Sequence, residues 1–336
     1  MPRSLVEVLE NDAEPVSDVV RTFRRPRRGA ARFEFPAQPA PGDLGGYISA
    51  FCFLRGALEA MAEEVALLRR RDEAHRRTIT RFREQMRAAA AIQRDLLPAC
   101  LPPIAGLDVC TVFRPVEALS GDLYDVFRID DTHVGFFIAD ATGHGLPGGV
   151  LSTFISRSFR GNRLRNGSHR LLQPDEILSG LNRELLDVGF TDCPFVTALY
   201  AVYHEPTRTL TWARGGAPYP ILARRREKPR QIVSHGPLVG AIEEANFEVV
   251  TLTLNPGDTV VFHTDGLENL ASDRSDPHPC RDVSDTDWFQ RLGQDPIQRQ
   301  LQELEARLTA LHEADWRADD ITVVALQVRE NQLRAG

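Results

Sequence analysis

The stretch VGFFIADATGHG, residues 134–145, places an apolar run directly before an aspartate, two glycines and a histidine. The run VGFFIA fits a buried strand, and the glycines after Asp140 fit a tight turn. An aspartate in this position is either a turn residue or a ligand of a metal ion. The other motifs of the chain bear on which of these interpretations holds.

Composition excludes several classes of protein. The chain has 336 residues, of which 42% are hydrophobic, enough for a globular core. Its formal net charge of −7 gives no general attraction to nucleic acid or anionic lipid, so neither partner is predicted. Five scattered cysteines without C-x-x-C spacing indicate neither a disulfide framework nor a zinc site. With no signal-peptide segment and no apolar run near the roughly 18 residues that span a bilayer, we expect a soluble cytoplasmic protein.

Residues 1–45 are rich in proline, arginine and small residues, and they show no sustained period of 2 or 3.6. This composition predicts a flexible N-terminal tail. The arginine cluster RTFRRPRR, residues 21–28, is either an ordinary solvated segment or a docking patch for an acidic partner.

Residues 46–97 contain no proline and predict a long linker helix. From Phe51 onward, side chains recur at the 3-4 spacing of a coiled coil, with Phe51 to Gln93 as a positions and Leu54 to Leu96, Leu68 included, as d positions. One polar layer, at Asp72 and His75, interrupts this apolar repeat. A lone helix would expose this stripe over about 70 Å at 1.5 Å per residue. We therefore expect a parallel homodimer through residues 51–97, the alternative being a helix that packs on its own domain. The polar layer weakens the seam locally and is a candidate switch.

Three prolines in LLPACLPPIAG, residues 96–106, end the helix, and the chain then becomes rich in strands. The strands come in hairpin-like groups rather than in alternation with helices. This order favours an α+β domain of antiparallel sheets covered by helices over residues 98–330. Helices are predicted near residues 147–160, 174–188 and 295–313.

Four aspartates share one context, because each lies at the end of an apolar strand or at a tight glycine turn. They are Asp122, Asp140, Asp265 and Asp319. Each alone reads as a turn residue, but hard divalent cations need several oxygen ligands, which carboxylates from separate strands supply. Other hydrolytic motifs are missing, including G-x-S-x-G, G-x-x-x-x-G-K-[ST] and H-E-x-x-H. The recurrence therefore favours a metal site.

Several motifs occur in a recognisable order between residues 90 and 328. They are AAIQRDLLP, SGDLYDVF, DATGHGLPGGVL, FVTALYAVYHEPTRTLTWARGGAPYPIL, GPLVGAIEEANFE, LNPGDTVVFHTDGLEN and ADDITVV. In wording and order they resemble the SpoIIE/RsbU branch of the metal-dependent, phosphatase 2C-like protein serine/threonine phosphatases. The resemblance implies two packed antiparallel β-sheets flanked by helices, an α-β-β-α sandwich, as the phosphatase domain.

The resemblance also implies a centre of two Mg²⁺ or Mn²⁺ ions. Carried over by motif, Asp140 is the bridging carboxylate and the backbone carbonyl of Ala141 binds one metal. Asp265 and Asp319 are implied ligands of the other metal, and Asp122 binds directly or through water.

Neighbouring residues receive supporting roles. Asp320 is expected to orient Asp319. The glycines Gly143, Gly145 and Gly266 are expected to let the backbone approach the metals. For His144 two roles stay open: it protonates the departing serine or threonine oxygen, or it only hydrogen-bonds the turn.

Two cations lower the pKa of a shared water by several units and offset the charge of phosphate, so that hydroxide attacks phosphorus in line. In this branch the usual substrate is a phosphorylated anti-sigma-factor antagonist of the STAS type, and the entering helix controls activity. Only about 50 residues precede the helix, too few for an ordinary sensor domain. Control is therefore expected from a separate regulatory protein, from the tail or from the dimer. The alternative is a catalytically silent scaffold that binds a signalling partner, and the full set of carboxylates argues against it.

Small departures from the family pattern leave every carboxylate in place. The first motif reads SGD, with Ser120 where glycine is usual, and Ala217 stands where a histidine often occurs. The acidic segment 273–287 is either a solvated loop or the source of a third metal ligand. Substrate choice or turn geometry is expected to differ, but not activity itself.

Overall fold

A computed structural model provides the structure of the chain. It describes residues 40–41, 43–143, 145–165, 171–190, 195–269, 287–312 and 319–330. The predicted tail up to residue 39, the candidate acid His144 and residues 273–286 of the acidic segment lie outside the described residues. Within the described part, no helix is both long and apolar enough to cross a bilayer.

The predicted linker helix is present as α3 (Leu44–Arg94). Beyond Arg94 the backbone tightens, because the N–H of Leu96 bonds to the carbonyl of Gln93 at 3.0 Å, and Pro98 then stops the helix. The chain forms two compact units, residues 1–83 and residues 84–336, so α3 contributes to both.

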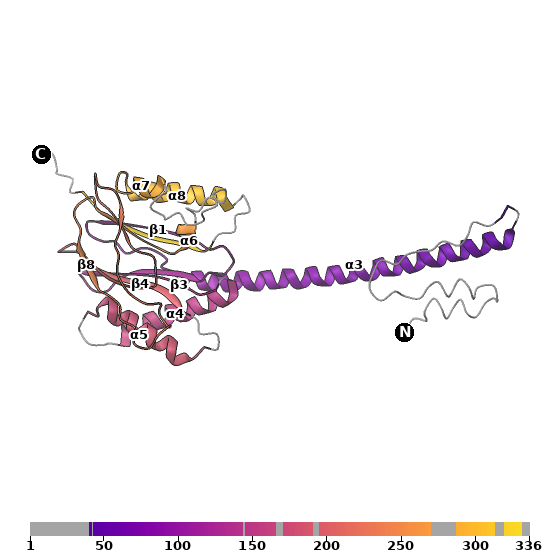
Figure 1. Ribbon diagram of the computed structural model, residues 1–336, viewed down its shortest axis with the longest axis horizontal. Coiled ribbons are helices and arrows are strands. Elements are labelled where there is room, and N and C mark those ends of the chain that lie inside the picture. The colour runs from indigo at the N-terminus through magenta and orange to yellow at the C-terminus, as the bar shows by residue number, and fades with distance from the viewer. Residues whose placement is uncertain are drawn as a thin grey trace. The chain divides into compact units, whose positions relative to one another are not determined.

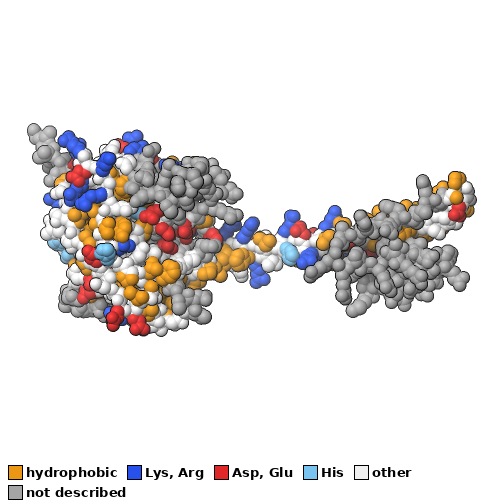
Figure 2. Space-filling model, in the orientation of Figure 1, with side chains coloured by type: hydrophobic (Ala, Val, Ile, Leu, Met, Phe, Trp, Pro, Cys, Tyr) orange, Lys and Arg blue, Asp and Glu red, His pale blue; other side chains and the backbone are white. Residues whose placement is uncertain are grey.

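In the first unit, α3 exposes the apolar stripe of its heptad repeat. Phe51, Leu58 and Phe82 keep 67%, 66% and 55% of their surface accessible, and hydrophobic side chains are visible along the helix in Figure 2. The polar layer is paired within the helix, where Arg76 Nε lies 2.8 Å from Asp72 Oδ2. That ion pair forms within one helix, whereas the apolar stripe stays exposed in this unit.

In the second unit, the same stripe is covered along the last turns of α3. Met86, Ala89 and Gln93 are half-buried, and Ala90 is only 3% exposed. Leu97, just past the helix, packs against the core of the domain that follows. The alternative interpretation, a helix packed on its own domain, therefore holds for this end of the repeat.

Two five-stranded antiparallel sheets form that domain, called the sandwich below. The first sheet has the order β1 (Leu107–Arg114), β10 (Ile321–Val328), β9 (Thr259–His263), β6 (Ile221–Ala223) and β7 (Arg230–Gln231). The second has the order β2 (Asp122–Arg128), β3 (His133–Ala141), β4 (Val196–His204), β5 (Thr209–Gly215) and β8 (Val250–Thr253). Each hydrogen-bonded pair of strands is antiparallel, as predicted.

Helices cover the outer faces of both sheets (Figure 1). The first sheet carries α7 (Asp287–Arg291) and α8 (Ile297–His312), and the second carries α4 (Gly145–Arg165) and α5 (Pro174–Val188). A short helix, α6 (Gly266–Asn269), follows β9. The predicted α-β-β-α sandwich and its three predicted helices are confirmed.

Strand β3 is buried on both faces, which explains the continuous apolar run VGFFIA. Successive side chains of a strand point to opposite faces. Phe136 accordingly belongs to the core between the sheets, where its ring lies 6.4 Å from Phe262. Phe137 points to the helices and stacks on Phe159 of α4, with ring centroids 3.9 Å apart. Packing on both sides fixes the end of β3, where Asp140 lies.

Candidate metal centre

The pairing of β2 with β3 brings the first two candidate carboxylates together. Asp122, the first residue of β2, lies directly opposite Asp140 near the end of β3. Directly opposed residues of an antiparallel pair have their Cβ atoms about 4.5–5.5 Å apart. Both carboxylates therefore lie at the same end of the second sheet.

The other two candidates come from the first sheet. Asp265 follows β9, and Asp319 precedes β10. These strands are neighbours, and the N–H of Thr264 donates to the carbonyl of Thr322 at 3.0 Å where the pair reaches its end. The ends of four strands from two sheets thus carry the four aspartates.

Two threonine hydroxyls connect the sheets at this point. Thr264 Oγ1 and Thr322 Oγ1 both donate to Asp122 Oδ2, at 2.7 and 2.6 Å. Asp122 is almost fully buried, so these bonds satisfy one of its oxygens without water. Sequence reasoning missed both threonines. The available signal was that Thr264 directly precedes Asp265.

The carboxylates strongly affect one another. Burial, together with the charges of Asp265, Asp319 and Asp320, raises the pKa of Asp140 to about 7. Burial and the charge of Asp140 raise the pKa of Asp122 well above its usual value, although the two threonine hydrogen bonds oppose the rise. Burial and then Asp319 raise the pKa of Asp265. Bound cations relieve this kind of repulsion.

The donor set fits hard divalent cations. Carboxylates and a backbone carbonyl are the ligands that Mg²⁺ and Mn²⁺ prefer. Asp140 is half-buried, whereas Asp265 and Asp319 are exposed at the rim. Among the described residues, no three acidic, imidazole or thiol side chains are already grouped closely enough to hold an ion. The fit consequently rests on the chemistry of the donors and on their mutual repulsion.

Glycines permit close backbone contacts around Asp140. Gly143 and Gly145 have φ angles of +96° and +65°, a region that favours glycine. A Cβ on Gly121 would lie 2.6 Å from the carbonyl oxygen of Ala141, so only glycine fits there. Gly266 has ordinary φ, and it is required because a Cβ would collide with the carbonyl of Asp320. Gly121 was not predicted.

The role of Asp320 differs from the expected one. Its backbone N–H, rather than its side chain, bonds to Asp319, donating to Oδ1 at 2.9 Å. The buried carboxylate faces the loop before β2 instead, where it accepts the N–H of Val116 at 2.7 Å and the N–H of Gly121 at 2.9 Å. Asp320 therefore holds the loop that leads to Asp122.

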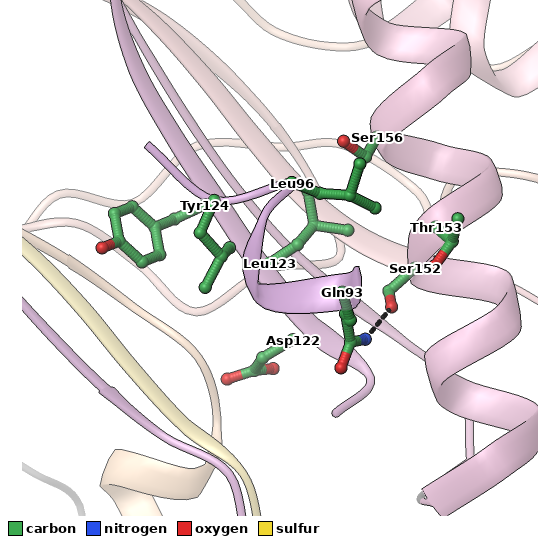
Figure 3. Close-up of a pocket in the computed structure, with 9 residues that line it drawn as sticks. Gln93, Leu96, Asp122, Leu123, Tyr124, Ser152, Thr153 and Ser156 are labelled. Carbon is green, nitrogen blue, oxygen red and sulfur yellow. Dashed lines mark hydrogen bonds between the residues drawn. The ribbon is translucent and has the colours of Figure 1, made fainter. Parts of the chain in front are cut away.

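The end of α3 reaches the same loop through Gln93. Its Nε2 donates to the carbonyl of Ser120 at 2.6 Å and to Ser152 Oγ of α4 at 2.8 Å, and its Oε1 accepts the N–H of Ser120 at 3.0 Å. Figure 3 shows the bond to Ser152 beside Asp122, in a small pocket that these residues line. Gln93 was predicted as a position of the heptad repeat, without a function of its own.

A protein-family model agrees with the motif order. Residues 130–329 match the model described as stage II sporulation protein E, SpoIIE. Protein IcfG of Synechocystis sp. is 20% identical over 289 residues, which cover 79% of this chain and 44% of that protein. Phosphoserine phosphatase RsbU of Bacillus subtilis is 24% identical over 187 residues, 55% of this chain and 54% of that protein. The chain thus spans about half the length of these curated relatives.

The solved structures support the fold. The SiaA-PP2C domain of Pseudomonas aeruginosa superposes with a TM-score of 0.62 at 18% identity, over 74% of this chain and 98% of that chain. A likeness at this identity indicates shared architecture, which is the phosphatase 2C fold.

Proposed function

The chain belongs to the SpoIIE family, and from that premise we propose that it is a metal-dependent phosphoserine/phosphothreonine protein phosphatase. One observation carries the proposal: the ends of four strands bring Asp122, Asp140, Asp265 and Asp319 to one edge of the sandwich, where the pKa of Asp140 is raised to about 7. A set of repelling carboxylates weakens a fold unless it binds cations. Such a set is therefore better explained by binding than by structure.

In the proposed centre each residue has a distinct task. Asp140 and the carbonyl of Ala141 would hold one Mg²⁺ or Mn²⁺ ion, and Asp140 together with Asp265 and Asp319 would hold the other. Asp122 has one oxygen occupied by two threonines, which leaves its second oxygen for a direct or water-mediated contact. When bound, the ions supply an acidic water and offset the charge of the phosphate. His144 stays a candidate proton donor to the leaving oxygen.

Phosphate release from p-nitrophenyl phosphate with Mn²⁺ tests the proposal. We expect Asp265→Asn to lower the rate by roughly 100-fold or more, because a ligand is lost. The control is Asp131→Asn, an exposed aspartate in the loop between β2 and β3, which we expect to leave the rate unchanged. Turnover without metal would contradict the proposed metal dependence, and no turnover by well-folded protein would favour the silent scaffold.

We propose a phosphorylated STAS-type anti-sigma-factor antagonist as the substrate. The support is the family assignment together with the phosphoserine phosphatase RsbU among the relatives. The assay should compare the rate of phosphate release from phosphorylated STAS proteins of the same source with the rate from unrelated phosphoproteins. Equal rates on both groups would contradict this choice of substrate.

We further propose that the exposed stripe of α3 pairs in parallel with that of a second copy, and that the state of the helix controls the domain through Gln93. The stripe is continuous in spacing, exposed before Arg83 and covered after it. A separate regulatory protein that binds the helix would act through the same contact.

A further inference from the structure

We propose that Ser120 is a positioning residue. It fixes the loop before β2, which leads to Asp122, against Asp140, and this inference rests on the proposed metal centre. Ser120 is fully buried. Its Oγ donates to Asp320 Oδ2 at 2.7 Å and accepts the N–H of Asp122 at 3.1 Å. One hydroxyl therefore joins a buried carboxylate on the first sheet to the backbone of a candidate ligand on the second.

The backbone of Ser120 is held from two other directions. Its carbonyl accepts Gln93 Nε2 at 2.6 Å and Ser152 Oγ at 2.9 Å, and its N–H donates to Gln93 Oε1. Helix α3, helix α4 and the residue before β10 thus meet at one serine. With all its polar groups paired, the residue has a single defined position.

Asp320 depends on this hydroxyl. It is only 5% exposed, and its carboxylate accepts three donors: Val116 N–H on Oδ1, and Ser120 Oγ and Gly121 N–H on Oδ2. Loss of the hydroxyl leaves Oδ2 with one backbone donor and leaves the N–H of Asp122 without its acceptor. Buried polar groups without partners destabilise the local structure that they shape.

Small movements of this loop change the spacing of the carboxylates. Gly121 packs so closely that an added Cβ would lie 2.6 Å from the carbonyl oxygen of Ala141 and 3.0 Å from that of Gly143. Because Asp122 lies directly opposite Asp140, a shift at Gly121 moves one candidate ligand relative to the other. Metal sites need their ligands held within about 0.5 Å of the binding geometry.

Glycine, the usual residue at this position in the SpoIIE/RsbU pattern, has no side chain to make these bonds. Ser120 therefore gives this chain a connection between Asp320 and Asp122 that the usual motif lacks. We infer that the serine raises metal affinity in this chain rather than the rate of the chemical step.

Mn²⁺ binding to the full-length chain, measured by calorimetry, tests the inference. We expect Ser120→Ala to weaken Mn²⁺ binding about 10-fold while changing kcat at saturating Mn²⁺ less than about 3-fold. Amide hydrogen exchange of Asp122 should accelerate, and the Tm of the metal-free chain should fall by about 3–6 °C. The matched control is Ser156→Ala, a buried serine of α4 that lines the same pocket.

Unchanged Mn²⁺ affinity together with unchanged exchange at Asp122 overturns the proposal. If Ser120→Ala does not fold, Ser120→Gly decides, because it introduces the usual residue of the motif and is expected to act in the same direction. If the wild-type chain binds no Mn²⁺, the proposed function fails, whereas the exchange and Tm measurements still decide whether Ser120 holds the loop.

Discussion

The apolar stripe of helix α3 meets two environments along its length. Between Phe51 and Phe82 its side chains are exposed, whereas from Met86 onward the same spacing is covered and ends in the hydrogen bonds of Gln93. The sequence pattern is alike in both parts, so the repeat predicts a stripe but does not specify what covers it. The covered part is packed within one chain, and for the exposed part we propose a second helix.

The largest expected effect concerns the exposed part. Leu68 occupies a seam position and Leu67 the position beside it, and both are exposed. In a parallel dimer Leu68→Glu places two charges in the seam and removes two buried leucines, each contributing about 1.5–3 kcal/mol. We expect sedimentation to show dimerisation weakened at least about 100-fold. Leu67→Glu is the control and should dimerise as wild type does.

Equal effects of the two substitutions would contradict a defined seam. A wild-type chain that sediments as a monomer at micromolar concentration would contradict the dimer itself.

The covered part should respond through catalysis and stability. Gln93→Ala removes three hydrogen bonds and leaves the buried N–H of Ser120 without an acceptor, whereas the Ser120 carbonyl keeps its bond from Ser152 Oγ. We expect the free energy of unfolding to fall by about 2–3 kcal/mol, with slower phosphate release, as measured by denaturant titration and the p-nitrophenyl phosphate assay. Gln85→Ala, an exposed position on the same helix, should change neither quantity. If Gln93→Ala alone abolished dimerisation, the exposed and covered parts of α3 would not have the separate roles proposed for them.

The cluster of Asp122, Asp140, Asp265 and Asp319 offers a third contrast, because its charges repel one another and cations, rather than an apolar partner, would relieve that repulsion. The pKa of Asp140 rises from 3.8 to about 7 on folding, mainly through burial and then through Asp265 and Asp319. The folded chain thus holds this proton more tightly than the unfolded chain, and the free energy of unfolding falls as pH rises from about 4 to about 7.

Thermal unfolding of the metal-free chain should therefore show a Tm a few degrees lower at about pH 7.5 than at about pH 5. Mn²⁺ and the substitution Asp140→Asn should each flatten this dependence, since both remove the repelling charge. A slope that Asp140→Asn leaves unchanged would assign the effect to other groups.

The sequence predicted those features whose signal lies within one strand or one helix. Strand β3 was predictable because continuous apolar residues mark a strand buried on two faces, and Asp140 because it ends that strand. Thr264 and Thr322 were missed, because threonine is an ordinary residue in and beside strands until its hydroxyl is seen to face Asp122. The position of Thr264 directly before Asp265 was the one available signal. Gln93 looked like one more member of the stripe, since sequence spacing does not show where the helix meets the sandwich.

Asp320 illustrates the same limit. Two adjacent aspartates suggest that one supports the other, but neighbouring side chains at the start of a strand point in opposite directions. The carboxylate consequently serves a loop about 200 positions away in sequence, with Ser120 as its partner. Only the three-dimensional pairing of β10 with β1 and its approach to β2 reveals that contact.

The double hydrogen bond to Asp122 Oδ2 has a consequence for how this fold tolerates change. Both donors belong to the first sheet and the acceptor belongs to the second. The position of Asp122 therefore depends on the distance between the two sheets. We therefore expect substitutions at Phe262 or Trp212, deep in the core between the sheets, to change the spacing of the carboxylates. In the proposed metal centre, the preference between ions of different radius should then be adjustable from the hydrophobic interior, without any replacement among the ligands.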